Sequence, residues 1–361
     1  MRLTCLIAAV FAFAACQRMQ RDLPPSATAA EAHAPPPSQW MAGVSIADEP
    51  GPYDSPEALT VYDHLVKQGV RAVALTPAAY LPDLHKPGLR WREHAHIREG
   101  VIAAHNKGLA VLIKPYIWSH VFFTQDTMWT GKIEMFTEDD WRSFFKTYQE
   151  FTLTYARIAE ETHAELFSIG LEYPKTFSRT TEWNALIAAV RNVYHGPITY
   201  ASTGVDEAET VPFWKKLDVI GIDAFVPLTD DLHPTKEMLC ESWKSYVARL
   251  EAIHQKYNKP IMFTEAGYKS CVGAACRPWE WNEHTPHPLD LQQQSVCYDA
   301  LATSLFNKPW FAGIFWWKYF TSMNAGGTRD NDFCPLGKPA EKMMKAWFVK
   351  KRSGAGGPGA E

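Results

Sequence analysis

Short apolar segments alternate with longer amphipathic segments along the chain from Trp40 onward. The apolar segments are rich in Val, Ile and Leu and carry few charges, which is typical of parallel strands buried on both faces. The alternation therefore predicts successive strand–helix units. The strands are expected at Trp40–Ile46, Val70–Thr76, Leu109–Pro115, Leu166–Glu172, Pro197–Ser202, Leu217–Phe225, Ile261–Glu265 and Gly313–Trp317.

Amphipathic segments of helical period follow the strands, one after each. They are expected at Ser55–Lys67, Glu93–Asn106, Glu138–Thr162, Thr181–Tyr194, Glu207–Lys216, Thr235–Tyr257, Leu289–Asn307 and Lys338–Phe348. Eight pairs over about 310 residues predict an α/β fold, a single-domain (β/α)8 TIM barrel. A doubly wound open sheet is the alternative, but no Gly-rich phosphate loop follows the first strand and eight units exceed what such a sheet needs.

The N-terminus has the pattern of an export signal. Arg2 precedes the apolar run Leu3–Ala15, which has the length of a secretory signal and is too short to span a bilayer. The small residues before Cys16 resemble a bacterial lipobox, although Phe13 replaces the usual aliphatic residue. We expect a signal peptide over residues 1–15 and a lipid on Cys16; a plain signal peptide cleaved nearby is the alternative. Both alternatives predict an exported protein, and the lipid anchor predicts a place in the cell envelope, in a membrane leaflet that the sequence does not specify.

The remaining domain boundaries follow from composition. Residues 16–39 contain Pro24-Pro25, Ala-rich runs and Pro35-Pro36-Pro37, which indicate an extended tether. The barrel domain is expected over residues 40–350, and residues 351–361 are expected to form a flexible tail.

Composition narrows the class of partner. The 361 residues carry a formal charge of −4, which gives no basic field for nucleic acid, and the only membrane contact expected is the N-terminal lipid. The chain contains 14 Trp, 14 Tyr and 19 Phe, more flat aromatic surface than a core usually requires. Stacking on the faces of an oligo- or polysaccharide is one use for this surplus, and ordinary core packing is the other.

Charged residues in the otherwise apolar strands lie at the strands' C-terminal ends, where (β/α)8 barrels build their active sites. They are Lys114, Glu172, Asp223, Glu265 and Lys318. Glu172 and Glu265 end the fourth and seventh strands and can face one another across the barrel. Retaining glycoside hydrolysis needs two carboxyl groups about 5–5.5 Å apart, and no cofactor. The alternative is a pair of acids held in rim salt bridges.

Several segments resemble glycoside hydrolases of clan A, and family 113 most of all, a group of (β/α)8 enzymes that includes endo-β-mannanases. The resemblance runs from Trp40 to about Phe348, and the order of the segments on successive strands makes it specific. The segments are Lys114-Pro-Tyr-Ile-Trp118, Phe167-Ser-Ile-Gly-Leu-Glu172, Asp218-Val-Ile-Gly-Ile-Asp223, Phe263-Thr-Glu-Ala-Gly-Tyr268 with Arg277-Pro-Trp279, Phe315-Trp-Trp317 and Gly337-Lys-Pro-Ala340.

The resemblance implies a retaining hydrolase of a β-linked glycan, with β-mannan or a related polysaccharide favoured. It makes Glu172 the general acid/base and Glu265 the nucleophile. Many clan members place Asn before the acid/base to bind the sugar 2-hydroxyl, whereas this chain has Leu171. Any hydrogen bond to that hydroxyl must therefore come from elsewhere.

Substrate-binding residues are expected around this pair. Trp316 and Trp317 point to opposite sides of their strand, so one lines the barrel's opening and the other packs against helices; the sequence does not say which. Lys114 and Asp223 either bind hydroxyl groups and orient the carboxylates, or form a rim salt bridge. The loop 120–137 holds Phe122, Phe123 and Trp129 and is expected to wall a carbohydrate site. The complete set of expected binding residues is Lys114, Trp118, Tyr200, Asp223, Tyr268, Trp279, Trp316 and Trp317.

The spacing of the cysteines and histidines assigns neither a disulfide nor a metal site. Five Cys remain beyond Cys16, at positions 240, 271, 276, 297 and 334, so at least one is unpaired, and Cys271 with Cys276 can close a small loop. No His or Cys grouping has the spacing of a zinc site, and no metal is expected. Two other functions remain open: a non-catalytic carbohydrate-binding lipoprotein on a TIM-barrel scaffold, and a metal-dependent barrel hydrolase.

Overall fold

The computed structural model describes residues 34, 36–92, 95–125, 127–280 and 287–354. The expected signal peptide and the lipidation site Cys16 lie outside these residues, as does most of the tether. Helix α9 runs over Pro339–Ser353 and so extends three residues into the segment expected to be a tail.

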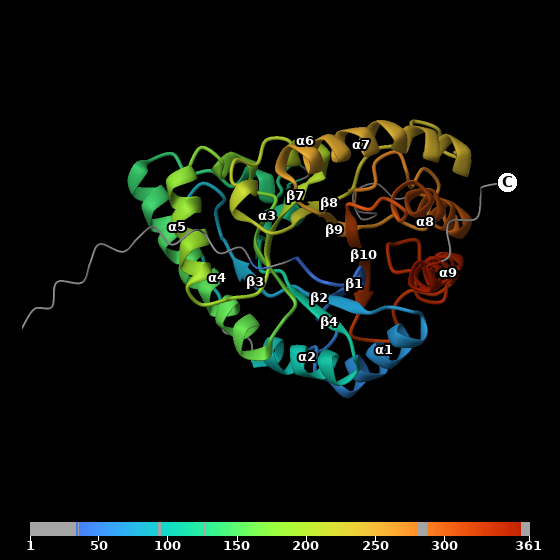
Figure 1. Ribbon diagram of the computed structural model, residues 1–361, viewed down its shortest axis with the longest axis horizontal. Helices are drawn as coiled ribbons and strands as arrows, with labels where there is room; N and C mark the ends of the chain where they lie inside the picture. Colours follow the sequence, from blue (N-terminus) through green and yellow to red (C-terminus); the bar gives the residue numbers. More distant parts are fainter. Residues whose placement is uncertain (1–33, 35, 93–94, 126, 281–286, 355–361) are drawn as a thin grey trace, which may run out of the picture. The chain divides into compact units, whose positions relative to one another are not determined.

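The described residues form a closed barrel of eight parallel strands, which confirms the predicted fold (Figure 1). Each strand pairs with the next along the chain, and the last pairs with the first, so the sheet has no free edge. In order around the barrel the strands are β1 (Met41–Ala47), β2 (Ala72–Leu75), β4 (Ala110–Ile113), β6 (Leu166–Leu171), β7 (Ile198–Thr203), β8 (Ile220–Asp223), β9 (Ile261–Ala266) and β10 (Phe311–Phe320).

Long helices surround the barrel close to their predicted positions (Figure 1). Thr137 and Thr235 cap two of them by accepting hydrogen bonds from backbone amides of the first turn, at Asp140 and Met238. In the described part of the chain, none of the helices combines the length and hydropathy that a membrane span requires. The helices are α1 (Pro56–Lys67), α2 (Ala95–Asn106), α4 (Glu138–Thr162), α5 (Thr180–Arg191), α7 (Lys236–Tyr257), α8 (Leu291–Leu305) and α9.

One predicted helix is wrong. Residues 207–216 form no continuous helix; instead the short helix α6 (Gly204–Ala208) is followed by a separate 3-10 turn, η3 (Trp214–Lys216). Pro212 lies between them, and its missing amide hydrogen and its ring are incompatible with the interior of a helix.

Short elements that the sequence analysis did not anticipate lie beyond the C-terminal ends of the strands. Strands β3 (Ala78–Tyr80) and β5 (Tyr116–Trp118) pair in a two-stranded sheet that extends from β2 and β4. The loop after β5 contains helix α3 (Val121–Thr124) and the 3-10 turn η1 (Thr130–Lys132), and a further turn, η2 (Pro174–Thr176), follows β6.

The barrel's interior is filled by side chains that form a cluster of their own, separate from the larger core between strands and helices. Phe315 is its largest member and lies over Gly43, where a Cβ atom would come within 2.5 Å of the Phe315 ring. We call this cluster the inner layer; it consists of Met41, Ala72, Ala74, Leu112, Leu166, Val219, Met262 and Phe315.

Candidate active site

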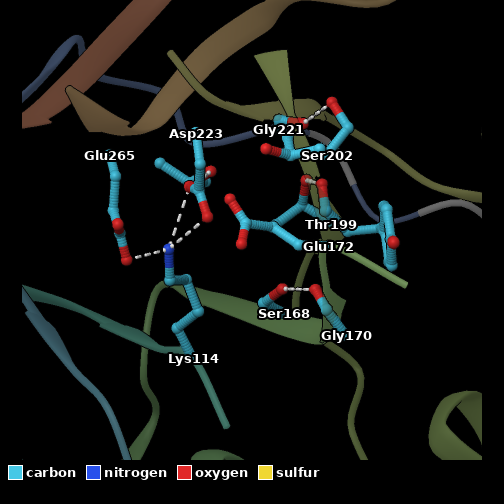
Figure 2. A network of polar contacts seen from close by, with 12 residues as sticks. Lys114, Ser168, Gly170, Glu172, Thr199, Ser202, Gly221, Asp223 and Glu265 are labelled. Atoms are coloured by element: carbon cyan, nitrogen blue, oxygen red, sulfur yellow. Dashed lines mark hydrogen bonds and ion pairs between the residues drawn. The ribbon is translucent and has the colours of Figure 1, made fainter. Parts of the chain in front are cut away.

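Three charged residues meet at the C-terminal ends of the barrel strands, which we call the mouth (Figure 2). Lys114 directly follows β4, Asp223 ends β8 and Glu265 lies near the end of β9. Lys114 Nζ lies 2.9 Å from Asp223 Oδ1 and 2.5 Å from Glu265 Oε1. The Thr264 hydroxyl donates a further hydrogen bond of 2.7 Å to Asp223. The network thus joins residues from three strands.

A shift in strand pairing explains how Glu265 reaches this network. Side chains alternate between the two faces of a strand, so Met262 in the inner layer predicts that Thr264 also points inward and that Glu265 points outward. However, β9 contains one extra residue relative to β8, because Ile222 pairs with Phe263 while Asp223 pairs with Glu265. Such a bulge re-aims the following side chain, and both Thr264 and Glu265 contact the network.

Glu172 approaches the same network from β6. In Figure 2 its carboxylate points toward the side chains of Asp223, Lys114 and Glu265. Its backbone has φ = 57°, a left-handed conformation that non-glycine residues seldom adopt. Thr130, from the turn η1, donates a hydrogen bond of 3.0 Å to Glu172 Oε2. The strand pairing of β6 also shifts by one residue just before Glu172, so both glutamates follow irregular strand positions.

Glu172 and Glu265 have different charged neighbours, and these neighbours change the pKa of each carboxyl group differently. Burial raises the pKa of Glu172, the negative charges of Asp223 and Glu207 raise it further, and Lys114 and Thr130 only partly oppose this. Burial and Asp223 also raise the pKa of Glu265, but Lys114 opposes that rise both by its charge and by a direct hydrogen bond. Because the two carboxyl groups interact, they titrate as a pair, and the hydrogen bond from Lys114 favours the ionised form at Glu265.

Lys114 itself is fully buried. Burial lowers the pKa of its ammonium group, but Asp223 and Glu265 outweigh that effect and the net shift is upward. The lysine is therefore a permanent cation shared by two carboxylates, so the salt bridge that the sequence analysis left open is present.

Three of the expected aromatic residues present an exposed ring surface. The side chains of Trp118 and Trp279 are 37% and 48% exposed, and Trp317 is partly exposed. Trp316 is only 1% exposed and stacks on Tyr298 of α8, with ring centroids 3.8 Å apart. The structure therefore resolves the choice between the neighbouring tryptophans: Trp316 packs against the helices.

Direct substrate contact by Tyr200, Tyr268 and Trp316, which the sequence analysis expects, does not fit their burial. All three side chains lie inside the protein. Tyr268 packs near Tyr298, and Tyr200 uses its hydroxyl for internal hydrogen bonds with the Tyr173 amide and Glu207.

The amino-acid sequence matches the model of a known enzyme family. The sequence model of glycoside hydrolase family 113 matches residues 44–338, which cover most of the barrel. The chain belongs to glycoside hydrolase family 113. It is therefore a glycoside hydrolase of retaining clan A, with an oligo- or polysaccharide as its substrate, and the non-catalytic alternative is set aside.

Solved structures of family 113 enzymes are similar over nearly their whole length. A complex of a family 113 β-1,4-mannanase has 26% sequence identity and a TM-score of 0.75, with 86% of this chain and 99% of that chain covered. The β-mannanase AaManA from Alicyclobacillus acidocaldarius, in complex with ManMIm, has 25% identity and a TM-score of 0.75, with 87% and 98% covered. None of the curated proteins matches the chain.

More distant similarity extends to other barrel enzymes. A β-glucuronidase from Faecalibacterium prausnitzii has 14% identity and a TM-score of 0.56, with 86% of this chain and 49% of that chain covered. At this identity the similarity shows the fold alone.

Near the two glutamates the structure adds Thr130 and Tyr116, which the sequence analysis did not assign to the site. Thr130 contacts Glu172, and its neighbour Trp129 is 38% exposed and lies over Gly131, where a Cβ atom would come within 2.2 Å of the ring. Tyr116, in β5, is close enough to Glu265 that their charges interact; burial raises its pKa to about 12, with smaller contributions from acidic neighbours that include Glu265. The loop containing Trp129 was expected at the site, but no local pattern singles out Thr130.

Glu207 was also missed. It lies in α6, is buried, and accepts hydrogen bonds from the Tyr200 hydroxyl and the Thr203 amide at 2.7 and 3.0 Å. The sequence signal was obscured because residues 207–216 read as one amphipathic helix, in which a glutamate is expected to face solvent.

The described cysteines are all free thiols, Cys271 and Cys276 included. Within the described residues, no three His, Cys, Asp or Glu side chains are grouped as metal ligands.

Proposed function

We propose that the chain hydrolyses β-mannan or a closely related β-linked glycan by double displacement, with Glu265 as nucleophile and Glu172 as general acid/base. Both enzymes of family 113 described above are β-mannanases, and they align with nearly all of the barrel. The observation that carries the assignment of roles is the unequal partnership of the two acids. Glu265 is paired with a buried ammonium group, whereas Glu172 receives a hydrogen bond from a neutral hydroxyl.

In the first step, an ionised Glu265 oxygen attacks the anomeric carbon while Glu172 gives its proton to the departing glycosidic oxygen. The glycosidic bond breaks, an ester bond forms between the sugar and Glu265, and Glu172 becomes ionised. Lys114 stabilises the ionised nucleophile before the attack. When the ester forms, the ammonium group keeps Asp223 as its partner, so no buried cation is left without a counter-charge.

In the second step, Glu172 accepts a proton from a water molecule, whose oxygen attacks the anomeric carbon. The ester bond breaks, and Glu265 leaves as a carboxylate that is stabilised again by Lys114. The raised pKa of Glu172 suits both steps, because the same group must hold a proton in the first and accept one in the second.

Exposed rings around the carboxyl groups provide surfaces for sugar stacking. Trp317 continues β10 directly beyond Phe315 of the inner layer, which favours it as the platform for the sugar at the cleavage site. Trp129 is partly exposed and is adjacent to Thr130, which contacts the acid/base. This position favours the Trp129 ring as the stacking surface for the sugar on the leaving-group side.

Glycan specificity is tested by measuring the reducing ends released from β-mannan, xylan, β-glucan and peptidoglycan. We expect β-mannan to be the preferred substrate. Preference for another glycan by tenfold or more in kcat/KM would contradict the substrate assignment without touching the assignment of Glu172 and Glu265.

The roles of the two acids are tested with the variants Glu172→Gln and Glu265→Gln and with a 2-deoxy-2-fluoro glycosyl donor carrying an activated leaving group. Such donors trap the ester intermediate, and we expect peptide mass spectrometry to find the sugar on Glu265. Each variant should lose activity on the natural glycan by about 10³-fold or more. Glu209→Gln, which changes an exposed carboxylate paired with Arg249, is the matched control and should retain activity.

We further propose that the protein is exported and anchored to a membrane of the cell envelope by a lipid on Cys16. The support is the sequence pattern of residues 1–16. Replacing Cys16 with Ser is expected to move the protein from the membrane fraction to the soluble fraction. An unchanged membrane fraction would contradict the lipid anchor.

A further inference from the structure

The backbone that carries Glu172 is held by hydrogen bonds from its two sides. The Glu172 amide donates to the Ala201 carbonyl at 2.8 Å, and the next amide, of Tyr173, donates to the Tyr200 hydroxyl at 2.6 Å. These bonds bracket a residue whose φ of 57° is unfavourable for a side chain other than glycine. The direction in which the Glu172 carboxyl points therefore depends on where the Tyr200 hydroxyl lies.

The Tyr200 hydroxyl is in turn fixed by Glu207. Because the hydroxyl accepts a hydrogen bond from the Tyr173 amide, its own proton is free to be donated, and it is donated to Glu207 Oε1 at 2.7 Å. The other oxygen of Glu207 accepts from the Thr203 amide at 3.0 Å, so the carboxylate is held at both ends. A continuous chain of contacts thus runs from Glu207 to the backbone of Glu172.

Glu207 is an unusual residue for a purely structural site. Its side chain is 6% exposed, and within the described residues it has no ion pair with a lysine, arginine or histidine. Placing a carboxylate in such a position is unfavourable, and an amide or a water molecule can accept the same two hydrogen bonds at lower cost. We therefore expect the negative charge of Glu207 to have a function beyond accepting these two hydrogen bonds.

We propose that Glu207 is a positioning residue for the acid/base: through the Tyr200 hydroxyl it fixes the backbone that aims Glu172, and its negative charge favours the protonated, proton-donating form of Glu172. This rests on the proposed role of Glu172 as the general acid. The chain of hydrogen bonds supplies the geometry, and the like charges of two buried carboxyl groups supply the electrostatic effect.

Several other groups face Glu172, and the proposal takes them into account. Asp223 from β8 and Glu265 from β9 contribute negative charge, Lys114 after β4 contributes positive charge, and Thr130 donates a hydrogen bond. Glu207 itself faces Tyr200, the Thr203 amide and Asp223; burial, chiefly, raises its pKa to about 7. Its charge is therefore present above neutral pH, the range in which the general acid must resist losing its proton.

The test is the pH dependence of kcat/KM for Glu207→Gln on a β-mannan oligosaccharide, with Glu209→Gln, directly after the same short helix, as the matched control. Glutamine keeps an acceptor for the Tyr200 hydroxyl but removes the charge. The alkaline limb, which reports loss of the Glu172 proton, is expected to move to lower pH by about half a unit, which is about a threefold loss of activity above that pH. The control should superimpose on the wild-type profile.

A second measurement separates this role from a general disturbance of the fold. An aryl glycoside with a dinitrophenolate leaving group needs no proton in the first step, so its kcat/KM does not depend on the acid function of Glu172. Glu207→Gln should lose activity on the oligosaccharide and keep it on the aryl glycoside. Equal losses on both substrates, or an unmoved alkaline limb, would overturn the proposal.

The positional half of the proposal is tested with Tyr200→Phe, which removes the hydroxyl and leaves Glu207 in place. We expect kcat on the oligosaccharide to fall about tenfold with KM little changed, because the acid is displaced while the binding surfaces remain. An unchanged kcat would show that the hydroxyl does not position Glu172.

A readout without substrate keeps these outcomes distinct from a failure of the proposed function. Carbon-13 NMR of the glutamate carboxyl groups, with the Glu172 signal assigned by its loss in Glu172→Gln, follows that proton directly. Glu172 is expected to titrate at lower pH in Glu207→Gln than in the wild type. The same titration in both proteins would contradict the proposal, whatever glycan the enzyme hydrolyses.

Discussion

The inner layer of the barrel and the mouth are built on the same strands, only a few residues apart, and yet they differ in the kind of side chain that they bury. Leu112 belongs to the inner layer, and Lys114, two residues later, is the buried cation of the mouth. Likewise Val219 in the inner layer precedes Asp223, and Met262 precedes Glu265. The inner layer excludes charge and gains stability from apolar burial, whereas the mouth holds charges in place at a cost in stability.

The comparison shows how one sheet serves two purposes. The closed barrel with its inner layer supplies a rigid base, on which the upper ends of the strands hold groups that are unfavourable when buried singly. Changes in the inner layer should therefore affect stability first, and changes in the mouth should affect activity first. The following variants test this division in order of decreasing effect.

Lys114→Met should have the largest effect. It keeps the length of the side chain but leaves Asp223 and Glu265 as neighbouring buried carboxyl groups without a cation, so at least one must take up a proton. We expect kcat/KM to fall by about 10³-fold, and stability at neutral pH to fall by about 3–5 kcal/mol. Steady-state kinetics and urea unfolding would measure the two losses. Full activity in this variant would refute the role of the lysine.

Phe315→Ala tests the inner layer. Removing this ring leaves a cavity beside Gly43 and should lower the free energy of unfolding by about 3–5 kcal/mol. The fraction that remains folded should keep kcat within a few-fold of the wild type. Urea unfolding combined with active-site titration separates stability from activity, and a large loss of kcat in folded protein would break the division between the two regions.

The adjacent tryptophans provide a matched pair. Trp317→Ala should lower kcat/KM about ten- to hundredfold, with a modest change in stability, because it removes the partly exposed ring that we propose stacks on the sugar. Trp316→Ala should do the reverse, since its ring is buried against Tyr298. Kinetics and thermal unfolding of both variants check this, and similar behaviour of the two would contradict the assignment of their faces.

Thr130→Val should have the smallest effect. The hydroxyl hydrogen bond favours the ionised form of Glu172 and so lowers its pKa. Without it the acid holds its proton more tightly, and the alkaline limb of the pH–rate profile should move to higher pH, with a loss of activity of a few-fold at the optimum. This shift is opposite in sign to the shift expected for Glu207→Gln. A shift to lower pH in Thr130→Val would contradict the role given to the Thr130 hydroxyl.

Much of the fold follows from the sequence because it depends on local patterns. Buried parallel strands and amphipathic helices have different periods, and eight repeats of the alternation leave few architectures open. Helix α4 has the predicted bounds Glu138–Thr162, with Thr137 as its cap. Residues 207–216 carry an amphipathic pattern, but Pro212 interrupts the helix that this pattern predicts.

The site was predictable only in part. The positions of Lys114, Asp223 and the two glutamates at strand ends follow from the barrel, but their mutual contacts depend on strand register, and the extra residues in β6 and β9 leave no mark in the sequence. The alternation of Trp316 and Trp317 between the two faces was predicted, but which of them packs against the helices follows only from the position of Phe315 in the inner layer. The contact between Thr130 and Glu172 spans 42 residues and has no local signal.

The bulge in β9 has a consequence for how this scaffold tolerates change. Strict alternation lets only every second side chain of a strand reach the same face, whereas the extra residue in β9 allows the neighbouring side chains of Thr264 and Glu265 to contact the network together. Deleting Thr264 would restore strict alternation with the Glu265 carboxylate still on the inner face, and Asp223 would lose the hydroxyl that donates to it.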